Sequence, residues 1–238
     1  MSDELISIGE AAEMLGVSIS TLRRWDENGR FPAIESQGGH RRYSKSQIEI
    51  YLQDILALGQ DWAINNTEIP SKFYCADSSI FKAKLDKMHN ELIKIDNLNE
   101  IYPLIVAVAG EIGGNSFDHN LGNWPDIPGI FFGYDLVKRR VVLADRGRGI
   151  LATLKIVRPE LDDHKEALRV AFTEVLSGRA PENRGNGLKF VRKVVTRNLI
   201  GLTFQTGDAE LELEKDNSAL QIRDSKINLR GCLALLSF

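Results

Sequence analysis

Cysteine is scarce in this sequence, and long apolar runs are absent. Cys75 and Cys232 are the 2 cysteines among 238 residues, and neither belongs to a metal-ligand spacing. A disulfide framework and a cysteine zinc site are therefore excluded, and both residues are interpreted as reduced thiols. No stretch reaches the roughly 18 apolar residues of a membrane-spanning helix. The opening residues, Met1 to Glu4, are acidic where a signal peptide is basic, so we expect a bacterial-type cytoplasmic protein.

An excess of basic charge is also missing. The chain has 30 Lys and Arg against 33 Asp and Glu, which argues against a protein that coats nucleic acid. The basic residues of the first 55 positions are nevertheless focused: all lie between positions 23 and 45. Focused charge of this kind can bind phosphates even where the total charge is negative.

Capping signals predict two short helices at the start of the chain. Ser7 and Glu10 form a capping-box pattern before residues 8–15, and Gly16 suits a left-handed helix end. Ser18 can cap a second helix that Gly29 ends. In this second helix Ile19, Leu22 and Trp25 are predicted to face inward. The outward positions are Ser20, Thr21, Arg23, Arg24 and Asn28.

A hairpin and a third helix are predicted next. Residues 34–43 are typical of a hairpin turned at Gly38-Gly39, with His40, Arg41 and Arg42 at its exit. Ser44 can cap a helix that we expect to end near Leu58.

The residues Thr21-Leu22-Arg23-Arg24-Trp25 and Gly38-Gly39-His40-Arg41-Arg42-Tyr43 together resemble the winged helix-turn-helix of MerR-type regulators and phage excisionases. The resemblance implies binding to double-stranded DNA. The expected contact residues are Ser20, Thr21, Arg23, Arg24, His40, Arg41 and Arg42. The alternative is that these arginines form the solvated face of a module that binds a protein partner.

Composition changes after the third helix. Residues 59–71 combine Gly59, Asn65-Asn66 and Pro70 with little periodicity. We therefore predict a DNA-binding domain at residues 1–58, a linker at 59–71 and a second domain at 72–238.

Glu111, Asn115 and His119 fall four residues apart in a predicted helix at residues 97–121, so they share one helix face. An Asn oxygen suits the octahedral geometry of Mg²⁺, and a Glu carboxylate can act as a base that activates water. Gly113-Gly114, in the middle of this helix, predicts close packing of a lid or a partner chain.

Two further motifs follow in order. Asp145-Arg146-Gly147-Arg148-Gly149 follows a strand-like run at residues 140–144, and Arg184-Gly185-Asn186-Gly187-Leu188 opens a predicted helix at residues 188–198. With Glu111, Asn115 and His119, these motifs resemble the ATP-binding fold of the GHKL superfamily, which includes gyrase, MutL, sensor histidine kinases and anti-sigma-factor serine kinases.

This resemblance implies an α/β two-layer sandwich with a mixed sheet, preceded by the small, mainly α-helical winged domain. It implies ATP and Mg²⁺ as cofactors, Glu111 as the catalytic base and Asn115 as the metal ligand. Asp145 would accept a hydrogen bond from the adenine amine, with Gly147 and Gly149 giving the backbone close access to the base. Arg146 and Arg148 are expected to be solvated, and residues 150–184 to form a lid. The remaining ATP-binding residues by resemblance are His119, Arg184, Gly185, Gly187, Leu188 and Lys189.

Together the motifs predict a DNA-binding regulator that is controlled by ATP binding and Mg²⁺-dependent ATP hydrolysis. One alternative is a serine protein kinase of the anti-sigma type, and another is a nucleotide-sensing scaffold that does not hydrolyse ATP. We expect a homodimer, because one winged helix reads only a few base pairs.

Overall fold

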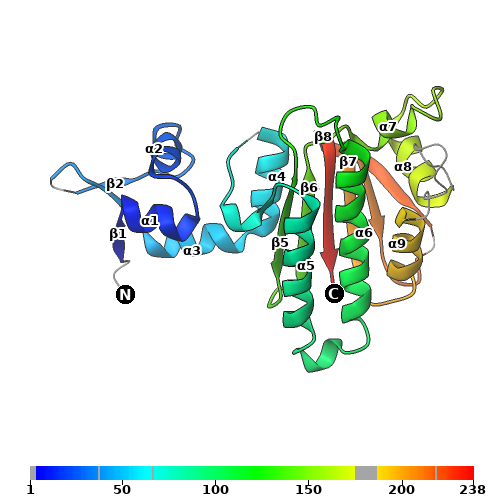
Figure 1. Cartoon of the computed structure of the whole chain (residues 1–238), viewed down its shortest axis with the longest axis horizontal. Coiled ribbons are helices and arrows are strands. Elements are labelled where there is room, and N and C mark those ends of the chain that lie inside the picture. The colour runs from blue at the N-terminus through cyan, green and yellow to red at the C-terminus, as the bar shows by residue number, and fades with distance from the viewer. Residues whose placement is uncertain (1–3, 37, 66, 175–186, 218) are drawn as a thin grey trace.

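A computed structural model describes residues 4–36, 38–65, 67–174, 187–217 and 219–238. Figure 1 shows a small N-terminal module beside a larger module built on a β-sheet, with helix α4 between them. The N-terminal module packs three helices against a small sheet of strand order β1-β3-β2. Its helices are α1 (Ile8–Leu15), α2 (Ile19–Glu27) and α3 (Lys45–Gln53), and its strands are β1 (Leu5–Ser7), β2 (Ile34–Glu35) and β3 (Arg41–Ser44).

The predicted caps of the N-terminal module are confirmed. Ser7 and Glu10 form both halves of a capping box, and Gly16 is left-handed with φ 66°. Ser18 accepts a hydrogen bond from the backbone of Thr21, and Ser44 accepts one from Gln47. Strands β2 and β3 pair antiparallel, which confirms the hairpin.

The inward face of α2 differs from the prediction at two positions. Leu22 and Trp25 are buried as expected, at 0% and 2% exposure. Ile19 is 42% exposed, because it lies in the first turn, away from the core. Thr21, predicted to face outward, is only 7% exposed, because a segment after α4 covers it.

The predicted linker is largely helical. The helix that Ser44 caps, expected to end near Leu58, ends at Gln53 as α3. A separate helix, α4 (Ile55–Asn65), follows and covers most of the predicted linker. Leu58 and Trp62 of α4 pack on Phe131 and Val142 of the large sheet. Gly59 permits this approach, because a Cβ there would lie 3.0 Å from Val142. The pattern was misread because the Gly and Asn residues of this stretch are typical of irregular segments.

The larger module contains an antiparallel five-stranded sheet of order β4-β5-β6-β8-β7. The expected mixed sheet is therefore wrong for the strands described. The strands are β4 (Tyr74–Cys75), β5 (Ile130–Asp135), β6 (Arg140–Asp145), β7 (Gly201–Leu213) and β8 (Gln221–Ser237). The apolar pattern predicts four short strands, at residues 202–205, 210–214, 219–223 and 232–236, which β7 and β8 replace. Irregular pairing around Gly207 lets β7 continue where the pattern predicts a break.

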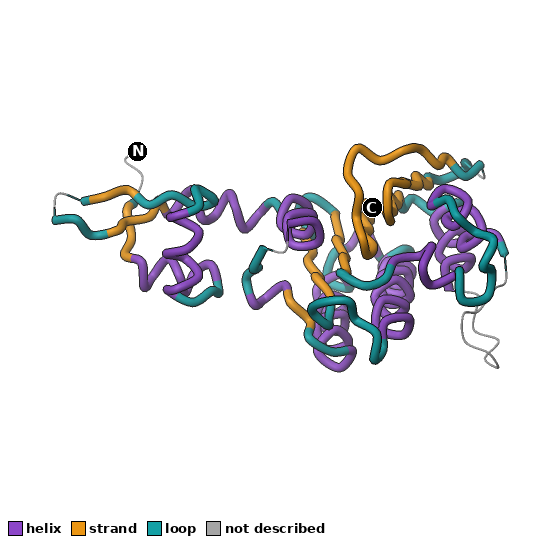
Figure 2. The backbone as a smooth tube through the Cα atoms, turned by 90° about the horizontal axis from the view of Figure 1, so that it is seen from above, coloured by secondary structure: helices purple, strands orange, loops and turns teal. Residues whose placement is uncertain are grey.

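Helices cover both faces of this sheet, as Figure 2 shows from above. Phe132, Val141 and Leu143 face a core shared with α5, α6, α8 and α9, whereas Phe131, Val142 and Ala144 face α4. The expected two-layer sandwich thus gains a third layer, formed by α4. The other elements are α5 (Ser78–Leu92), α6 (Tyr102–Asn120), α7 (Gly149–Leu154), α8 (His164–Thr173), α9 (Gly187–Val195), η1 (Ser71–Phe73) and η2 (Asp96–Leu98).

The structure changes the interpretation of the expected lid and of Gly113. Helices α7 and α8 and the segment between them form residues 150–173 of the expected lid, residues 150–184; Glu174 follows, and residues 175–184 lie outside the described residues. Gly113 packs against the ring of Phe81 in α5, so its lack of a side chain serves a contact within the chain rather than a partner. Among the described residues, no helix is long and apolar enough to span a membrane.

Candidate functional sites

Helix α2 and the hairpin carry the predicted DNA contacts. Ser20, Arg23 and Arg24 lie on the exposed side of α2, and His40 is exposed at the hairpin. Figure 1 shows the hairpin projecting from the end of the module that lies farthest from the large sheet. Arg42 is half-buried in β3. An exposed helix beside a projecting hairpin is the arrangement with which a winged helix contacts a duplex.

Arg41 is engaged within the module. Its Nε lies 2.6 Å from Oδ2 of Asp26, at the end of α2. Two hydrogen bonds hold the pKa of Asp26 below its usual value: the stronger effect comes from the backbone N–H of Ala33, and the next from the Arg41 side chain. Arg41 therefore ties the hairpin to α2, a role that its position in the sequence did not suggest.

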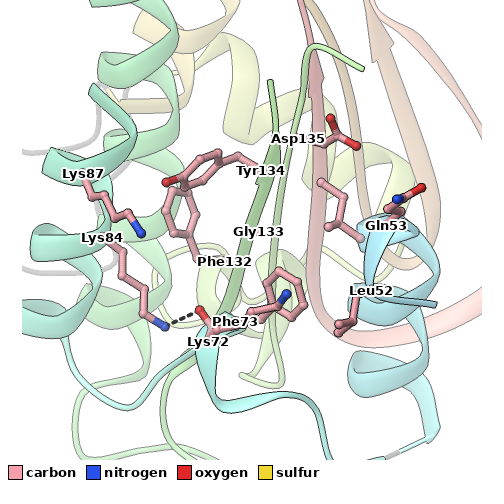
Figure 3. Close-up of a pocket in the computed structure, with 11 residues that line it drawn as sticks. Leu52, Gln53, Lys72, Phe73, Lys84, Lys87, Phe132, Gly133, Tyr134 and Asp135 are labelled. Carbon is pink, nitrogen blue, oxygen red and sulfur yellow. Dashed lines mark hydrogen bonds between the residues drawn. The ribbon is translucent and has the colours of Figure 1, made fainter. Parts of the chain in front are cut away.

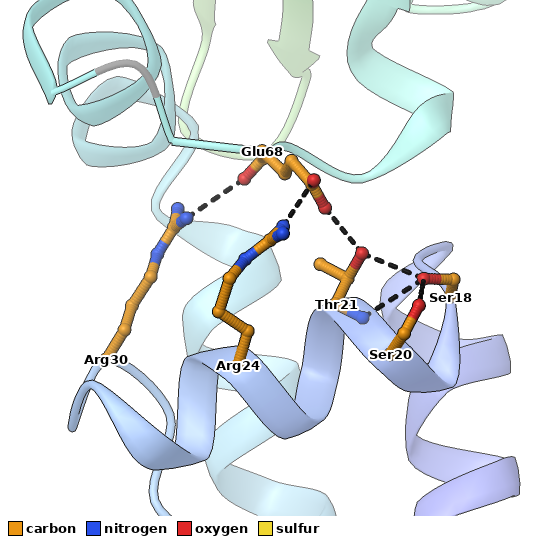
Figure 4. A network of polar contacts seen from close by, with 6 residues as sticks. All are labelled: Ser18, Ser20, Thr21, Arg24, Arg30 and Glu68. Atoms are coloured by element: carbon orange, nitrogen blue, oxygen red, sulfur yellow. Dashed lines mark hydrogen bonds and ion pairs between the residues drawn. The ribbon is translucent and has the colours of Figure 1, made fainter.

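Two other predicted DNA contacts meet a carboxylate that the sequence did not single out. Thr21 Oγ1 donates a hydrogen bond of 2.5 Å to Glu68, and Arg24 Nη2 forms an ion pair with the same carboxylate. Figure 4 shows both side chains pointing toward Glu68. Glu68 lies in the segment between α4 and η1, here called the connector (residues 67–70).

Arg30 joins the same region to α4. Its guanidinium donates to the backbone carbonyl of Glu68 at 3.0 Å and pairs with Asp61 of α4 at 2.8 Å. It also lies 4.2 Å from the ring centre of Trp25, so it connects the core of the N-terminal module to both α4 and the connector.

The second candidate site centres on α6. Glu111 is exposed, and Asn115 and His119 are half-buried along the same helix. Gly187, the first residue of α9, lies directly against two of them. A Cβ built on Gly187 would lie 2.6 Å from Glu111 Oε2 and 3.1 Å from Asn115 Nδ2. The fold therefore brings the first and third sequence motifs together at Gly187, whereas Arg184 and Gly185 lie outside the described residues.

Asp145 ends β6 beside the same helix. Ser116 of α6 donates to one oxygen of Asp145 at 2.8 Å, and the backbone N–H of Gly147 donates to the other at 2.8 Å. The side chain is 2% exposed. Burial raises the pKa of Asp145 to about 6, although the hydrogen bonds from Ser116, Gly147 and Cys232 act to lower it. Asp145 is thus a buried carboxylate with an environment that disfavours its charge.

Both glycines after Asp145 are explained by packing within the chain. A Cβ at Gly147 would collide with the Asn120 side chain, and one at Gly149 would lie 2.5 Å from the carbonyl oxygen of Arg230. Gly149 also has a positive φ of 77°. Close approach to an adenine base is therefore not needed to account for either glycine.

The neighbouring arginines are not solvated as expected. Arg146 is 7% exposed and lies 2.5 Å from Asp126, and Arg148 donates 2.7 Å to the backbone carbonyl of His119. Both arginines therefore have charged or polar partners within the fold. Alternating Arg and Gly residues are typical of an exposed loop, which is why the sequence predicts solvated side chains here.

Helix α9 contributes Leu188 and Lys189 to the predicted phosphate contacts. Leu188 packs at the edge of the main core. Lys189 donates to the backbone carbonyl of Glu174, and burial lowers the pKa of its ammonium group. This contact directs the Lys189 side chain toward the C-terminal end of α8.

The donor set can be compared with the needs of Mg²⁺ and ATP. Within the described residues, no group of three or more His, Cys, Asp or Glu could form a metal site on its own. Mg²⁺ bound to a nucleotide needs only one or two protein oxygens, because phosphates and water supply the rest. One Asn oxygen on α6, beside the backbone of Gly187, is compatible with that requirement.

A separate cavity lies at the junction of the modules, and Figure 3 shows it in close-up. Its volume is about 530 Å³, and residues of α3, β5 and α5 line it. Lys84 points into this region, but its ammonium group donates to the carbonyls of Ser71, Lys72 and Tyr74. None of the predicted site residues lines the cavity.

Comparison with known proteins assigns the first module. Residues 7–43 match the model of the MerR family regulatory protein, which confirms the MerR-type DNA-binding domain. The chain is also similar to the type II methyltransferase M.Eco47II of Escherichia coli, at 33% identity over 75 residues. That match covers 31% of this chain and 18% of the methyltransferase, so the chain spans under a fifth of that protein.

Proposed function

We propose that the chain is a DNA-binding regulator in which a MerR-type module is controlled by Mg²⁺ and ATP bound in the larger module. The observation that carries the ATP part is the contact of Gly187 with both Glu111 and Asn115. A glycine at the start of a helix places backbone N–H groups, which bind phosphate well, next to the carboxylate and the amide of a second helix.

Each side chain would have a separate role. Asn115 would bind Mg²⁺, and the Asp145 carboxylate would accept a hydrogen bond from the adenine amine. Bound Mg²⁺ would neutralise phosphate charge, as it does in other nucleotide sites. Glu111 is the exposed carboxylate beside Gly187 and would accept a proton from the attacking water.

The test measures binding and hydrolysis separately, using ATP with and without MgCl₂. Glu111→Gln should retain Mg²⁺-dependent binding and lose hydrolysis, because the amide keeps the shape but cannot take a proton. Asn115→Ala should lose the Mg²⁺-dependent part of binding. Glu100→Gln, at an exposed position before α6, is the matched control and should behave as the original protein.

Three outcomes separate this proposal from its alternatives. Hydrolysis at the original rate in Glu111→Gln would reject Glu111 as the base. Transfer of labelled phosphate from ATP to a protein in cell extract would favour the serine kinase. Binding without turnover by the original protein would favour the nucleotide-sensing scaffold.

Pairing of two chains is part of the same proposal, because one winged helix gives poor discrimination among DNA sites. If ATP binds the dimer more tightly than the monomer, ATP must strengthen dimerisation by a corresponding amount. Sedimentation of Glu111→Gln with and without Mg²⁺ and ATP measures this coupling. A monomer in both conditions, at concentrations that occupy DNA, would reject nucleotide-controlled pairing.

A further inference from the structure

Three side chains of the DNA-binding module contact Glu68. Thr21 Oγ1 donates to it from α2, and Arg24 pairs with it one helical turn later. Arg30 donates to the backbone carbonyl of the same residue. Figure 4 shows that these side chains reach Glu68 from one side of the module. The carboxylate itself is thus bound by one hydroxyl and one guanidinium group, and proteins use the same two kinds of donor to bind a phosphodiester.

Glu68 is held in this position by the rest of the connector. Thr67 donates to Asp61 of α4 at 3.0 Å, and Ile69 packs against the α4 side of the large sheet. The backbone N–H of Ser71, just after the connector, donates to the carbonyl of Gly16 between α1 and α2 at 3.1 Å. The connector therefore attaches α2 to the larger module, and a shift of the larger module would be transmitted to Glu68.

The exposure of the ion pair indicates that it can be displaced. The side chains of Arg24 and Glu68 are 58% and 49% exposed. An ion pair this exposed contributes little to stability, because water screens both charges. Each phosphate contact, in contrast, also releases counterions from the DNA. Exchange of the Glu68 carboxylate for a phosphate at Arg24 is therefore energetically accessible.

We propose that Thr21 and Arg24 form a DNA phosphate site that the Glu68 carboxylate occupies when the connector is docked on α2. Docking of the connector then withholds one backbone contact from DNA, and its release restores that contact. Ser20 and Arg23 stay exposed in the docked state, so the module keeps part of its DNA-binding surface. This inference rests on the proposed function of the first module as a DNA-binding unit, but it does not depend on ATP.

The experiment compares the full-length protein with Glu68→Gln in binding to a mixed-sequence linear duplex, without nucleotide, over a KCl titration. Glutamine keeps the size of the side chain and removes its charge. We expect Glu68→Gln to bind more tightly by up to about fivefold, the upper end of the range for release of an exposed ion pair. The dependence of affinity on salt should also become steeper by about 0.9, the slope for one added phosphate contact. Glu100→Gln makes the same change in net charge on an exposed surface and should change neither quantity.

Arginine variants then locate the gain. Arg24→Ala should have little effect in the original protein, where Glu68 occupies the guanidinium, but it should abolish the gain of Glu68→Gln. Arg23→Ala should weaken binding by a similar factor in both backgrounds. If the Glu68→Gln gain persists in the Arg24→Ala background, the phosphate site is not at Arg24 and the proposal is overturned.

The remaining outcomes separate this inference from the proposed function. Equal affinity and equal salt slope for Glu68→Gln and the original protein would overturn the phosphate site and leave DNA binding intact. Absence of duplex binding by both proteins would overturn DNA binding and the phosphate site together. Glu68→Asp guards against a folding defect, because it retains the charge on a side chain shorter by one methylene and should give an intermediate gain. An affinity for Glu68→Asp above that of Glu68→Gln would contradict the charge-based explanation.

Discussion

Gly187 and Glu111 lie so close that a Cβ on Gly187 would be 2.6 Å from the Glu111 carboxylate. The obstructing atom is the end of a flexible side chain, so an added methyl group would push the carboxylate aside at little cost in stability. Asn115, at 3.1 Å from the same point, would also have to adjust. This contact therefore allows the site to be altered without unfolding the protein.

Gly187→Ala should consequently reduce ATP hydrolysis far more than stability. Misplacement of a reacting group by about 1 Å can cost roughly 100-fold in rate. The measurement pairs steady-state hydrolysis with the urea midpoint of unfolding. A normal hydrolysis rate in a folded Gly187→Ala protein would show that this contact does not belong to the catalytic site.

The helix caps and the strand-like run at residues 140–144 were predictable because their signals are local. Ser7 with Glu10 and Ser44 with Gln47 lie three residues apart, so the sequence contains both partners of each contact. The pairing of Glu68 with Arg24 had no such signal, because 44 positions separate two exposed charged residues. Burial decided the remaining differences. Burial of Trp62 against the sheet stabilises α4 as a helix despite Gly59. The ion pair with Asp126 allows Arg146 to be buried.

Gly113 and Gly114, adjacent residues of α6, should respond to alanine in opposite directions. A Cβ at Gly113 would overlap the Phe81 ring, and one at Gly114 would meet nothing within 4 Å. Gly113→Ala should therefore destabilise the fold by about 1–3 kcal/mol through overpacking. Gly114→Ala should stabilise it by about 1 kcal/mol, because alanine favours a helix interior. Urea unfolding of the two variants measures both effects, and equal shifts would contradict the packing at Phe81.

Asp145 should make stability depend on pH in the direction opposite to a salt-bridged carboxylate. Burial raises its pKa to about 6 in the folded protein, against 3.8 for an ordinary Asp. The folded protein therefore binds a proton at a higher pH than the unfolded chain does. The cost of burying the charge is present above pH 6 and disappears as the pH falls through 6 toward 4.

The comparison with Asp145→Asn isolates this contribution, because both proteins share every other titrating group. Relative to Asp145→Asn, the original protein should gain stability as the pH falls from 7 to 4, by up to about 3 kcal/mol at 1.36 kcal/mol for each pKa unit. Urea midpoints at intervals across that range measure the difference. Desolvation of Asp126 is outweighed by the hydrogen bonds that it accepts from Ile127 and Arg146, so its pKa lies below the usual value. Relative to Asp126→Asn, the original protein should therefore lose stability as the pH falls. A constant difference between the original protein and Asp145→Asn would mean that the pKa of Asp145 is the same in the folded and the unfolded protein, and that its hydrogen bonds to Ser116 and Gly147 fully offset its burial.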